Sequence, residues 1–296
     1  MNYRHIFHAG NRCDVVKHAA LTLVLAHLRA KEGGFAVLDT HAGIGLYDLT
    51  DPRALKTDEA AEGILALLAA PALPALADYY EVLRKLNPLW DGKSTDDFRT
   101  YPGSPLIAFH MLRAQDRLIA CELHPEDAEI LRINAPVAVA RSAEQSRRKN
   151  NNHLQIHHRD GFEAMGAFLP PPEKRGIVLI DPPYEQPDEF ERTASHVAAA
   201  WRRWPTGIYM IWYPVKDRPA IWKFHEALAE AGIAKILCAE FIYQEETRAD
   251  RLNGSGLIII NPPWKLDEEL AALFPALHQA MRTNYAGVTV KWMMEG

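Results

Sequence analysis

The sequence predicts an α/β protein with a doubly wound, seven-stranded, mostly parallel sheet in which only the last strand is antiparallel. Three observations support this fold class. Short apolar runs alternate along the chain with longer segments of helical spacing. The last two runs, residues 235–243 and 256–261, stand too close together for a helical crossover, so they must form a hairpin. Four earlier runs each end at an acidic residue, which is typical of the ligand-binding edge of a parallel sheet.

The composition of the whole chain is that of a soluble globular protein. Its 296 residues carry a net charge of −5, and 48% of them are hydrophobic. The three cysteines, Cys13, Cys121 and Cys238, are too scattered for a disulfide framework or a zinc knuckle. No apolar stretch approaches the roughly 18 residues that span a membrane, and residues 1–11 hold no apolar run of a signal peptide. We therefore expect a cytoplasmic monomer that does not bind membranes.

The N-terminal region predicts an arm, a helix and a first strand. Residues 3–11 are polar and aromatic without periodicity, so we expect an extended arm that lies over the molecule. Residues 14–30 have helical spacing, with Asp14 as the N-cap. Residues 35–39 form a strand that runs into the turn Thr40–Gly45, whose two glycines allow a close approach to a ligand. On its own, this turn is also typical of any tight strand-to-helix connection.

An insertion separates the first two strands. The second strand, residues 117–122, begins much later than a crossover requires, since a strand–helix–strand unit takes roughly 30 residues. Residues 104–113 supply the crossover helix, with Ser104 as its N-cap. Residues 47–101 are therefore an insertion, and their alanine- and leucine-rich sequence predicts a helical subdomain. It either grips a substrate beside the ligand site or only adds stability.

The remaining segments complete a main domain of residues 1–46 and 102–296. Further strands and helices alternate, and a short strand ends the chain. The predicted bounds are 154–158, 176–180 and 207–213 for the next three strands, 189–201, 221–231 and 267–281 for helices, and 287–292 for the last short strand. The basic stretch 141–152 predicts a mobile loop, and a phosphate-binding face is the alternative.

Acidic residues end four of the parallel strands, namely Asp39, Glu122, Asp160 and Asp181. We expect these side chains to meet, because the carboxyl ends of parallel strands lie at one edge of a sheet. The combined pattern is a much stronger signal than any single motif. It is similar to the architecture of the Rossmann-like, class I methyltransferases, which use S-adenosylmethionine.

The nucleoside half of such a cofactor has three candidate partners in the sequence. Glu122 is placed to accept hydrogen bonds from both ribose hydroxyls. Asp160 can accept from the adenine amine, and Gly161 lets a backbone amide approach closely. The alternative for Glu122 is a surface acid without a ligand.

The methionine half would be held by the turn after the first strand. That turn contains His41 and Gly43. Ser104 could donate to the cofactor carboxylate at the N-terminus of its helix. Taken singly, Ser104 could be only a helix cap and His41 only a structural histidine.

The fourth strand ends in Asp181-Pro182-Pro183-Tyr184, which resembles the catalytic Asp-Pro-Pro-Tyr motif of amino-methyltransferases. Prolines donate no hydrogen bond, so nearby carbonyls stay free to accept one. An aromatic amine is a poor nucleophile, and acceptors at Asp181 and the Pro182 carbonyl would aim its lone pair at a methyl group. Tyr184 would stack on the base. Whether Asp181 also takes the departing proton is left open by the sequence.

A second stretch, Asn261-Pro262-Pro263-Trp264, has the same acceptor-Pro-Pro-aromatic pattern. It follows the reversed strand, whose carboxyl end points to the opposite edge of the sheet. We therefore predict that Asp181 is catalytic and that Asn261 is structural.

Seven blocks of sequence, in one order from end to end, resemble the RlmJ family. They are Tyr3–Asn11, Asp14–His18, Leu38–Gly43, Tyr101–Ala108, Glu122–Pro125, Ile180–Glu185 and Asn261–Leu266. The resemblance implies methylation of the N6 amine of one adenine in 23S ribosomal RNA. It also implies that Asp181 is the proton acceptor and that the arm, with Tyr3, His5 and Lys17, lies over the active site. The cofactor contacts implied by the resemblance are His18, His41, Ser104, Glu122, Asp160, Gly161 and Asp181.

Other functions remain as alternatives. His153, His157 and His158 do not predict a metal site, because neighbours on a strand face opposite ways and no carboxylate stands near them. A DNA adenine or protein glutamine methyltransferase would share the fold and cofactor, but no added DNA-reading domain is evident. A non-catalytic RNA-binding protein that keeps the fold is the rival from another class, and the intact Asp181–Tyr184 motif argues against it.

Overall fold

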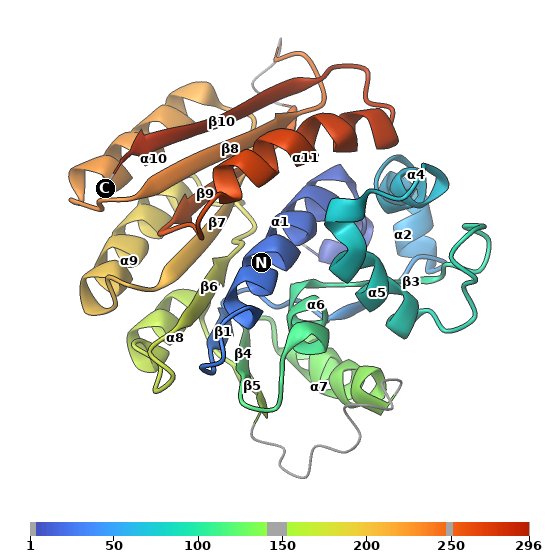
Figure 1. Cartoon of the computed structure of the whole chain (residues 1–296), viewed down its shortest axis with the longest axis horizontal. Helices are drawn as coiled ribbons and strands as arrows, with labels where there is room; N and C mark the ends of the chain where they lie inside the picture. The colour runs from blue at the N-terminus through green and yellow to red at the C-terminus, as the bar shows by residue number, and fades with distance from the viewer. Residues whose placement is uncertain (1–3, 141–152, 247–250, 296) are drawn as a thin grey trace.

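The computed structural model describes residues 4–140, 153–246 and 251–295. One eight-stranded sheet with the order β10-β8-β9-β7-β6-β1-β4-β5 runs through it, and a separate two-stranded ladder joins β2 to β3 (Figure 1). The strands are β1 Ala36–Asp39, β2 Leu46–Asp48, β3 Thr100–Pro102, β4 Arg117–Glu122, β5 Leu154–His158, β6 Gly176–Ile180, β7 Ile208–Val215, β8 Ile236–Ile242, β9 Gly254–Ile260 and β10 Gly287–Met294.

Strand directions confirm the predicted fold class and correct the strand count. Strands β1, β4, β5, β6 and β7 pair in parallel, and β9 lies antiparallel between β7 and β8. The prediction of seven strands is wrong by one, because β10 pairs antiparallel with β8 and becomes the edge of the same sheet. By covering β8, this strand supplies partners for backbone groups that an open edge would leave exposed.

Helices cover both faces of the sheet. Alternate residues of strands β6, β7, β8 and β9 belong to two different hydrophobic clusters, one under α1, α6 and α11 and the other under α8, α9 and α10, which lie on opposite sides of the sheet in Figure 1. The helical segments are η1 His5–Phe7, α1 Arg12–Arg29, α2 Pro52–Thr57, α3 Glu59–Glu62, α4 Ile64–Ala69, η2 Pro74–Leu76, α5 Ala77–Leu86, α6 Ser104–Met111, α7 Pro125–Ala140, α8 Gly161–Phe168, α9 Glu189–Arg203, α10 Arg218–Glu230 and α11 Leu266–Ala280.

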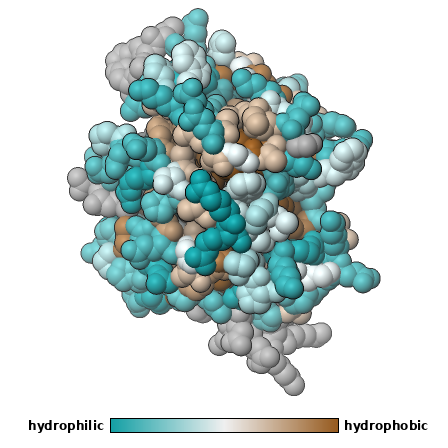
Figure 2. All heavy atoms as spheres, turned by 90° about the vertical axis from the view of Figure 1, so that its left-hand side faces the viewer, coloured by the Kyte–Doolittle hydropathy of each residue, from teal (hydrophilic) through white to brown (hydrophobic). Residues whose placement is uncertain are grey.

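The outer faces of these helices are polar. Figure 2 shows one side of the molecule, where hydrophilic side chains cover most of the surface and hydrophobic ones show mainly in the hollows between them. This is the side that α9 and α10 form in Figure 1. Both helices therefore bury one stripe against the sheet and leave the other in solvent, as expected for surface helices.

Two predicted helix caps are wrong. Helix α1 begins at Arg12, and the side chain of Asn11, not of Asp14, accepts from a backbone amide at its start. Asp14 is instead buried within the first turn, where its carboxylate has charged partners. Helix α6 has Gly103 as its N-cap, and Ser104 is the first helical residue.

The inserted segment is helical, as its composition predicts. The ladder between β2 and β3 pairs Leu46 with Pro102 and so closes the segment where its ends were predicted. Buried residues of α4 and α5 belong to the same hydrophobic cluster as those of α1 and α6. The insertion is therefore packed into the main core, and its treatment as a subdomain of residues 47–101 stays a prediction.

The N-terminal segment is not the extended arm that was predicted, but a short 3-10 helix followed by turns. Gly10 has a φ of 76°, a conformation that favours glycine, and its carbonyl accepts from the amide of Ile64 at 2.8 Å. A Cβ on Gly63 would lie 2.1 Å from the Gly10 oxygen. The segment is thus fixed against α4, and both glycines are needed for the approach.

Two sequence predictions fall outside the described residues. These are the stretch 141–152 and Tyr3. Within the described part of the chain, no single helix has the length and apolar content to cross a membrane, and one bent pair, Glu59–Ala69 with Pro74–Leu86, passes that test by length and composition alone.

The second acceptor-Pro-Pro-aromatic motif lies at the edge opposite the ends of the parallel strands, as predicted. The Asn261 amide donates to the carbonyls of Pro205 and Gly207, at 2.7 and 2.8 Å, just before β7 begins. Trp264 of this motif is 82% exposed. Asn261 therefore links the end of β9 to the start of β7.

We predict that Asn261→Ala lowers the free energy of unfolding by roughly 2 kcal/mol, because two carbonyls lose their donor. Asn261→Gly should lower the free energy of unfolding by a similar amount. Because glycine tolerates the φ of 53° found here, a loss in this variant reports the missing hydrogen bonds and not backbone strain. Urea unfolding monitored by circular dichroism measures both. Unchanged unfolding midpoints in the two variants would contradict a structural role.

Candidate active site

A cavity of about 390 Å³ opens at the carboxyl ends of β1, β4 and β6. Its size is within the usual range of small-molecule sites. Ten of the predicted site residues line it, namely His5, Lys17, His18, His41, Gly43, Ser104, Glu122, Asp181, Pro182 and Tyr184. Residues that were not predicted also line it, among them Asp14 and Trp212.

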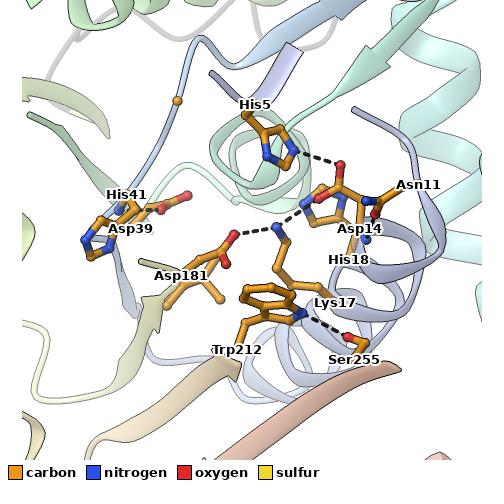
Figure 3. Close-up of polar contacts among 12 residues, drawn as sticks. His5, Asn11, Asp14, Lys17, His18, Asp39, His41, Asp181, Trp212 and Ser255 are labelled. Carbon is orange, nitrogen blue, oxygen red and sulfur yellow. Dashed lines mark hydrogen bonds and ion pairs between the residues drawn. The ribbon is translucent and has the colours of Figure 1, made fainter. Parts of the chain in front are cut away.

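An ion pair connects α1 to the Asp-Pro-Pro-Tyr motif. The ammonium of Lys17 donates to Oδ2 of Asp181 in a short contact, and to Oδ1 of Asp14 at 2.9 Å (Figure 3). The Lys17 side chain is 6% exposed, whereas Asp181 is 16% exposed and faces the cavity. Burial alone would lower the pKa of Lys17, but the two carboxylates outweigh it and raise that pKa above the ordinary value.

Asp14 is the second anchor of this network. Its Oδ2 accepts from Nε2 of His5 at 2.8 Å and from the amide of Gly10 at 2.9 Å. Burial raises the pKa of Asp14, but His5 and Lys17 outweigh that effect and hold the pKa well below its usual range. A buried carboxylate with three donors therefore fixes the N-terminal segment, α1 and the lysine to one another.

Glu122, the last residue of β4, is held by two backbone amides. Its Oε2 accepts from Gly43 at 2.8 Å and its Oε1 from His124 at 2.7 Å. Burial raises the pKa of Glu122, and these two hydrogen bonds oppose the rise. The carboxylate is thus oriented at the mouth of the turn after β1, with lone pairs left for hydroxyl donors.

Asp39 and His41 lie on either side of that turn's start. Burial raises the pKa of Asp39 to about 7; the Ser104 hydroxyl opposes this rise, and the neighbouring Asp181 adds to it. Nδ1 of His41 is hydrogen-bonded to the Thr40 hydroxyl at 2.8 Å. Burial lowers the pKa of His41 to about 4. His41 is therefore neutral at neutral pH.

His18 ends a chain of hydrogen bonds from the core. Its Nδ1 is 2.7 Å from the hydroxyl of Tyr101, which is 2.8 Å from the hydroxyl of Tyr79. Its other ring nitrogen, Nε2, is buried and has no hydrogen-bond partner among the described residues. Because His18 lines the cavity, this nitrogen is available to a ligand.

The aromatic residues beside Asp181 pack tightly. Tyr184 has a φ of 51°, and its hydroxyl donates to the carbonyl of Trp212 at 2.9 Å. Its ring contacts Phe190 with centroids 4.6 Å apart. Trp212 donates from its indole to the Ser255 hydroxyl at 2.9 Å and lines the cavity next to Lys17 and Asp181 (Figure 3). The acceptor at Asp181 is therefore flanked by two oriented aromatic rings.

Asp160 and Gly161 are not among the residues that line this cavity. Oδ1 of Asp160 accepts from the amides of Phe162 and Glu163, so this residue caps α8. A Cβ on Gly161 would lie 2.2 Å from the Thr40 oxygen, so the glycine permits close packing of α8 on the turn after β1. A cofactor contact at these two residues stays a prediction.

Known proteins match the chain over nearly its whole length. The family described as "Ribosomal RNA large subunit methyltransferase D, RlmJ" matches residues 32–294. Ribosomal RNA large subunit methyltransferase J of Haemophilus influenzae is 39% identical over 295 residues, and its namesake in Escherichia coli is 38% identical over 296; each match covers 99% of both chains. A crystal structure of a Legionella pneumophila protein has a TM-score of 0.82 at 32% identity, covering 96% of this chain and 98% of that one.

The chain belongs to the RlmJ family of large subunit ribosomal RNA methyltransferases. The family resemblance and the predicted class of enzyme are thereby confirmed. Neither a DNA methyltransferase nor a non-catalytic RNA-binding protein is favoured by these relatives. Membership in the RlmJ family, together with the fold, implies S-adenosylmethionine as the methyl donor.

The residues of the cavity fit that donor. Glu122 offers oriented acceptor oxygens for a ribose diol, and His18 offers a buried nitrogen that has no partner in the part of the chain that the structure describes. The N-terminus of α6, at Gly103 and Ser104, also lines the cavity and suits a carboxylate.

The described residues of this RlmJ-family chain contain one triad close enough to share a metal ion, His225, Cys238 and Glu240. Both oxygens of Glu240 already accept from Arg218, and Oε1 also accepts from Tyr213. A guanidinium thus balances the carboxylate charge without a metal.

We predict that Asp39 makes stability fall as pH rises. Its pKa is about 7 in the folded state and near 4 when unfolded, so its contribution is fully present below about pH 4 and is lost as pH rises through 7. Relative to Asp39→Asn, the wild type should lose roughly 4 kcal/mol of unfolding free energy, at most, over that interval. Urea unfolding at several pH values measures the difference. Parallel pH profiles for the two proteins would refute the assignment.

Proposed function

We propose that this chain transfers a methyl group from S-adenosylmethionine to the N6 amine of one adenine in 23S ribosomal RNA. The observation that carries the proposal is the environment of Asp181. This carboxylate follows β6 at the carboxyl edge of the sheet, faces the cavity, and is paired with the buried Lys17. An acceptor, two prolines and an oriented aromatic ring at one place suit an exocyclic amine on a flat base.

The residues around the cavity would hold the donor in one orientation. When bound, S-adenosylmethionine supplies an electrophilic methyl group on its sulfonium. Glu122 would accept from the ribose hydroxyls, and the start of α6 at Ser104 would receive the carboxylate. Asp160 uses only Oδ1 in its helix cap, which leaves Oδ2 to accept from the adenine amine of the donor.

Asp181 and the Pro182 carbonyl would orient the target amine. Oδ2 of Asp181 accepts from Lys17, so Oδ1 and the proline carbonyl remain for the two amine hydrogens. When these two oxygens accept both hydrogens, the nitrogen moves toward a tetrahedral geometry and its lone pair points at the methyl group. The rate is then raised mainly through proximity and orientation. Asp181 would then take the proton that the methylated amine loses.

Aromatic residues and the N-terminal segment would hold the RNA base. Tyr184 is fixed by its hydrogen bond to the Trp212 carbonyl and by its contact with Phe190, so its ring is oriented before a base stacks on it. An adenine must leave its helix to reach this position. His5 and Lys17 lie at the same cavity and, with Tyr3, would contact the substrate.

The same proposal includes the setting of the reaction. The enzyme would act in the cytoplasm, where ribosomal RNA is made, as a monomer and without a metal ion. The site has an acceptor in Asp181, a cation in Lys17 and an oriented ring in Tyr184, and these groups suffice for displacement of a methyl group from a sulfonium.

We predict that Asp181→Asn lowers the turnover of methyl transfer at least about 100-fold, since an amide neither carries the negative charge nor takes a proton. Lys17 keeps Asp14 as a partner, so the variant should fold and bind S-adenosylhomocysteine. Transfer of labelled methyl groups to 23S ribosomal RNA measures turnover. Asn261→Ala, at the corresponding position of the second motif, is the control and should keep its turnover at a temperature where it remains folded. Undiminished transfer by Asp181→Asn would overturn the mechanism.

We predict that the preferred acceptor is 23S ribosomal RNA and that duplex DNA accepts far fewer methyl groups. Both acceptors should be offered at equal adenine concentration with labelled donor, and the products digested to nucleosides. The label should appear as N6-methyladenosine. Preferential labelling of DNA would defeat the RNA assignment while leaving the role of Asp181 intact.

A further inference from the structure

Three buried side chains connect the insertion to the cavity. Tyr79 lies on α5 within the insertion, Tyr101 on β3 at its end, and His18 on α1. Both tyrosines are completely buried, and His18 is 1% exposed. The hydroxyls lie 2.8 Å apart, and the Tyr101 hydroxyl is 2.7 Å from Nδ1 of His18. Nothing in the proposed methyl transfer uses this chain of hydrogen bonds.

The two hydroxyl protons can be arranged in only a few ways. Among the described residues, the Tyr79 hydroxyl has only the Tyr101 hydroxyl as a hydrogen-bond partner, and the Tyr101 hydroxyl has only Tyr79 and His18. If Nδ1 of His18 carried a proton and donated to Tyr101, one of the two hydroxyl protons would be left without an acceptor in the core. If Tyr79 donates to Tyr101 and Tyr101 donates to Nδ1, every hydroxyl proton has an acceptor. Buried donors without acceptors are strongly disfavoured, so this last arrangement prevails.

We propose that Tyr101 is a positioning residue that holds His18 in the tautomer protonated at Nε2, which then donates to the carboxylate of the methyl donor. In this arrangement Tyr79 donates to the Tyr101 oxygen, but the tautomer does not depend on Tyr79, because without it Nδ1 of His18 is the only acceptor for the Tyr101 proton. The part of the proposal that concerns the ligand rests on the proposed function, whereas the tautomer does not.

The charge state of His18 agrees with this arrangement. Burial, together with the neighbouring Lys17, holds the pKa of His18 well below its usual range, so the ring is neutral. A neutral imidazole has one donor and one acceptor nitrogen, and Nδ1 is used as the acceptor. The remaining nitrogen, Nε2, is therefore the donor, and it is the one without a partner among the residues that the structure describes.

The position of Tyr101 indicates which ligand group His18 meets. Tyr101 lies two residues before Gly103, and Gly103 and Ser104 line the cavity at the start of α6. A helix N-terminus favours an anion, and the donor's only anionic group is its carboxylate. His18 would add one side-chain donor to the backbone amides there.

Nuclear magnetic resonance of the full-length protein with ¹⁵N-labelled histidine tests the tautomer without any ligand. Couplings between ring protons and ring nitrogens identify the protonated nitrogen of each histidine. The set of signals that is lost in His18→Gln belongs to His18, which assigns this residue among the 13 histidines. We expect Nε2–H in the wild type and in Tyr79→Phe, because Tyr101 then still has His18 as its acceptor. In Tyr101→Phe, we expect a mixture of both tautomers. An Nδ1–H tautomer in the wild type would overturn the proposal even if Tyr101→Phe failed to fold.

Calorimetric binding tests the consequence for the ligand. Tyr101→Phe should weaken S-adenosylhomocysteine binding roughly tenfold, and its decarboxylated analogue much less, since one charge-assisted hydrogen bond is impaired. Tyr80→Phe is the matched control, because Tyr80 lies on α5 beside Tyr79 and its hydroxyl accepts from the Leu73 amide, outside the chain of hydrogen bonds that reaches His18. Equal weakening of both ligands would overturn the carboxylate contact. Neither measurement uses RNA, so a failure of the proposed methyl acceptor would leave these results unaffected.

Discussion

A buried lysine between two carboxylates is the constraint on which the site depends. Lys17 is in contact with Asp14 on its own helix and with Asp181 at the end of β6. Removing a charge of this kind from water is costly unless partners surround it, and here Asp14 is itself ordered by the Gly10 amide and by His5. The consequence is a rigid link between α1 and the sheet edge, so the position of α1 determines where the cation that pairs with Asp181 lies.

The edge where the parallel strands end was predictable because its signals are local. Each of Asp39, Glu122 and Asp181 directly follows or ends an apolar run, and strand direction alone brings them together. The same reasoning separated Asp181 from Asn261, since a reversed strand ends at the other edge. The short strand 287–292 was predicted, but the pattern of single strands could not show that it joins the main sheet, because this depends on its pairing with β8.

The prediction for Asp14 was wrong because an aspartate near the start of a helix can either cap the helix or pair with a buried cation. An acid just before an apolar helix is typical of an N-cap, and Asn11 takes that role instead. A signal for the true role did exist, since Asp14 and Lys17 stand three residues apart within an otherwise apolar stretch and so lie on one helix face. Their common partner Asp181 is far along the chain, and no local pattern reveals it. Trp212 was missed for a related reason, because an aromatic residue within a strand is usually core.

The insertion holds the start of α1 in place, which a stabilising decoration would not need to do. Glu59 of α3 accepts from Asn11 and is paired with His8, while the amide of Ile64 donates to Gly10. Gly10 in turn donates to Asp14, so the insertion, the N-terminal segment and the buried carboxylate form one connected set of hydrogen bonds. Because Asp14 holds Lys17 and Lys17 holds Asp181, a displacement of α3 or α4 would be transmitted to the motif on β6. The inserted helices are thus coupled through hydrogen bonds to the Asp181 carboxylate, although they do not pack directly against it.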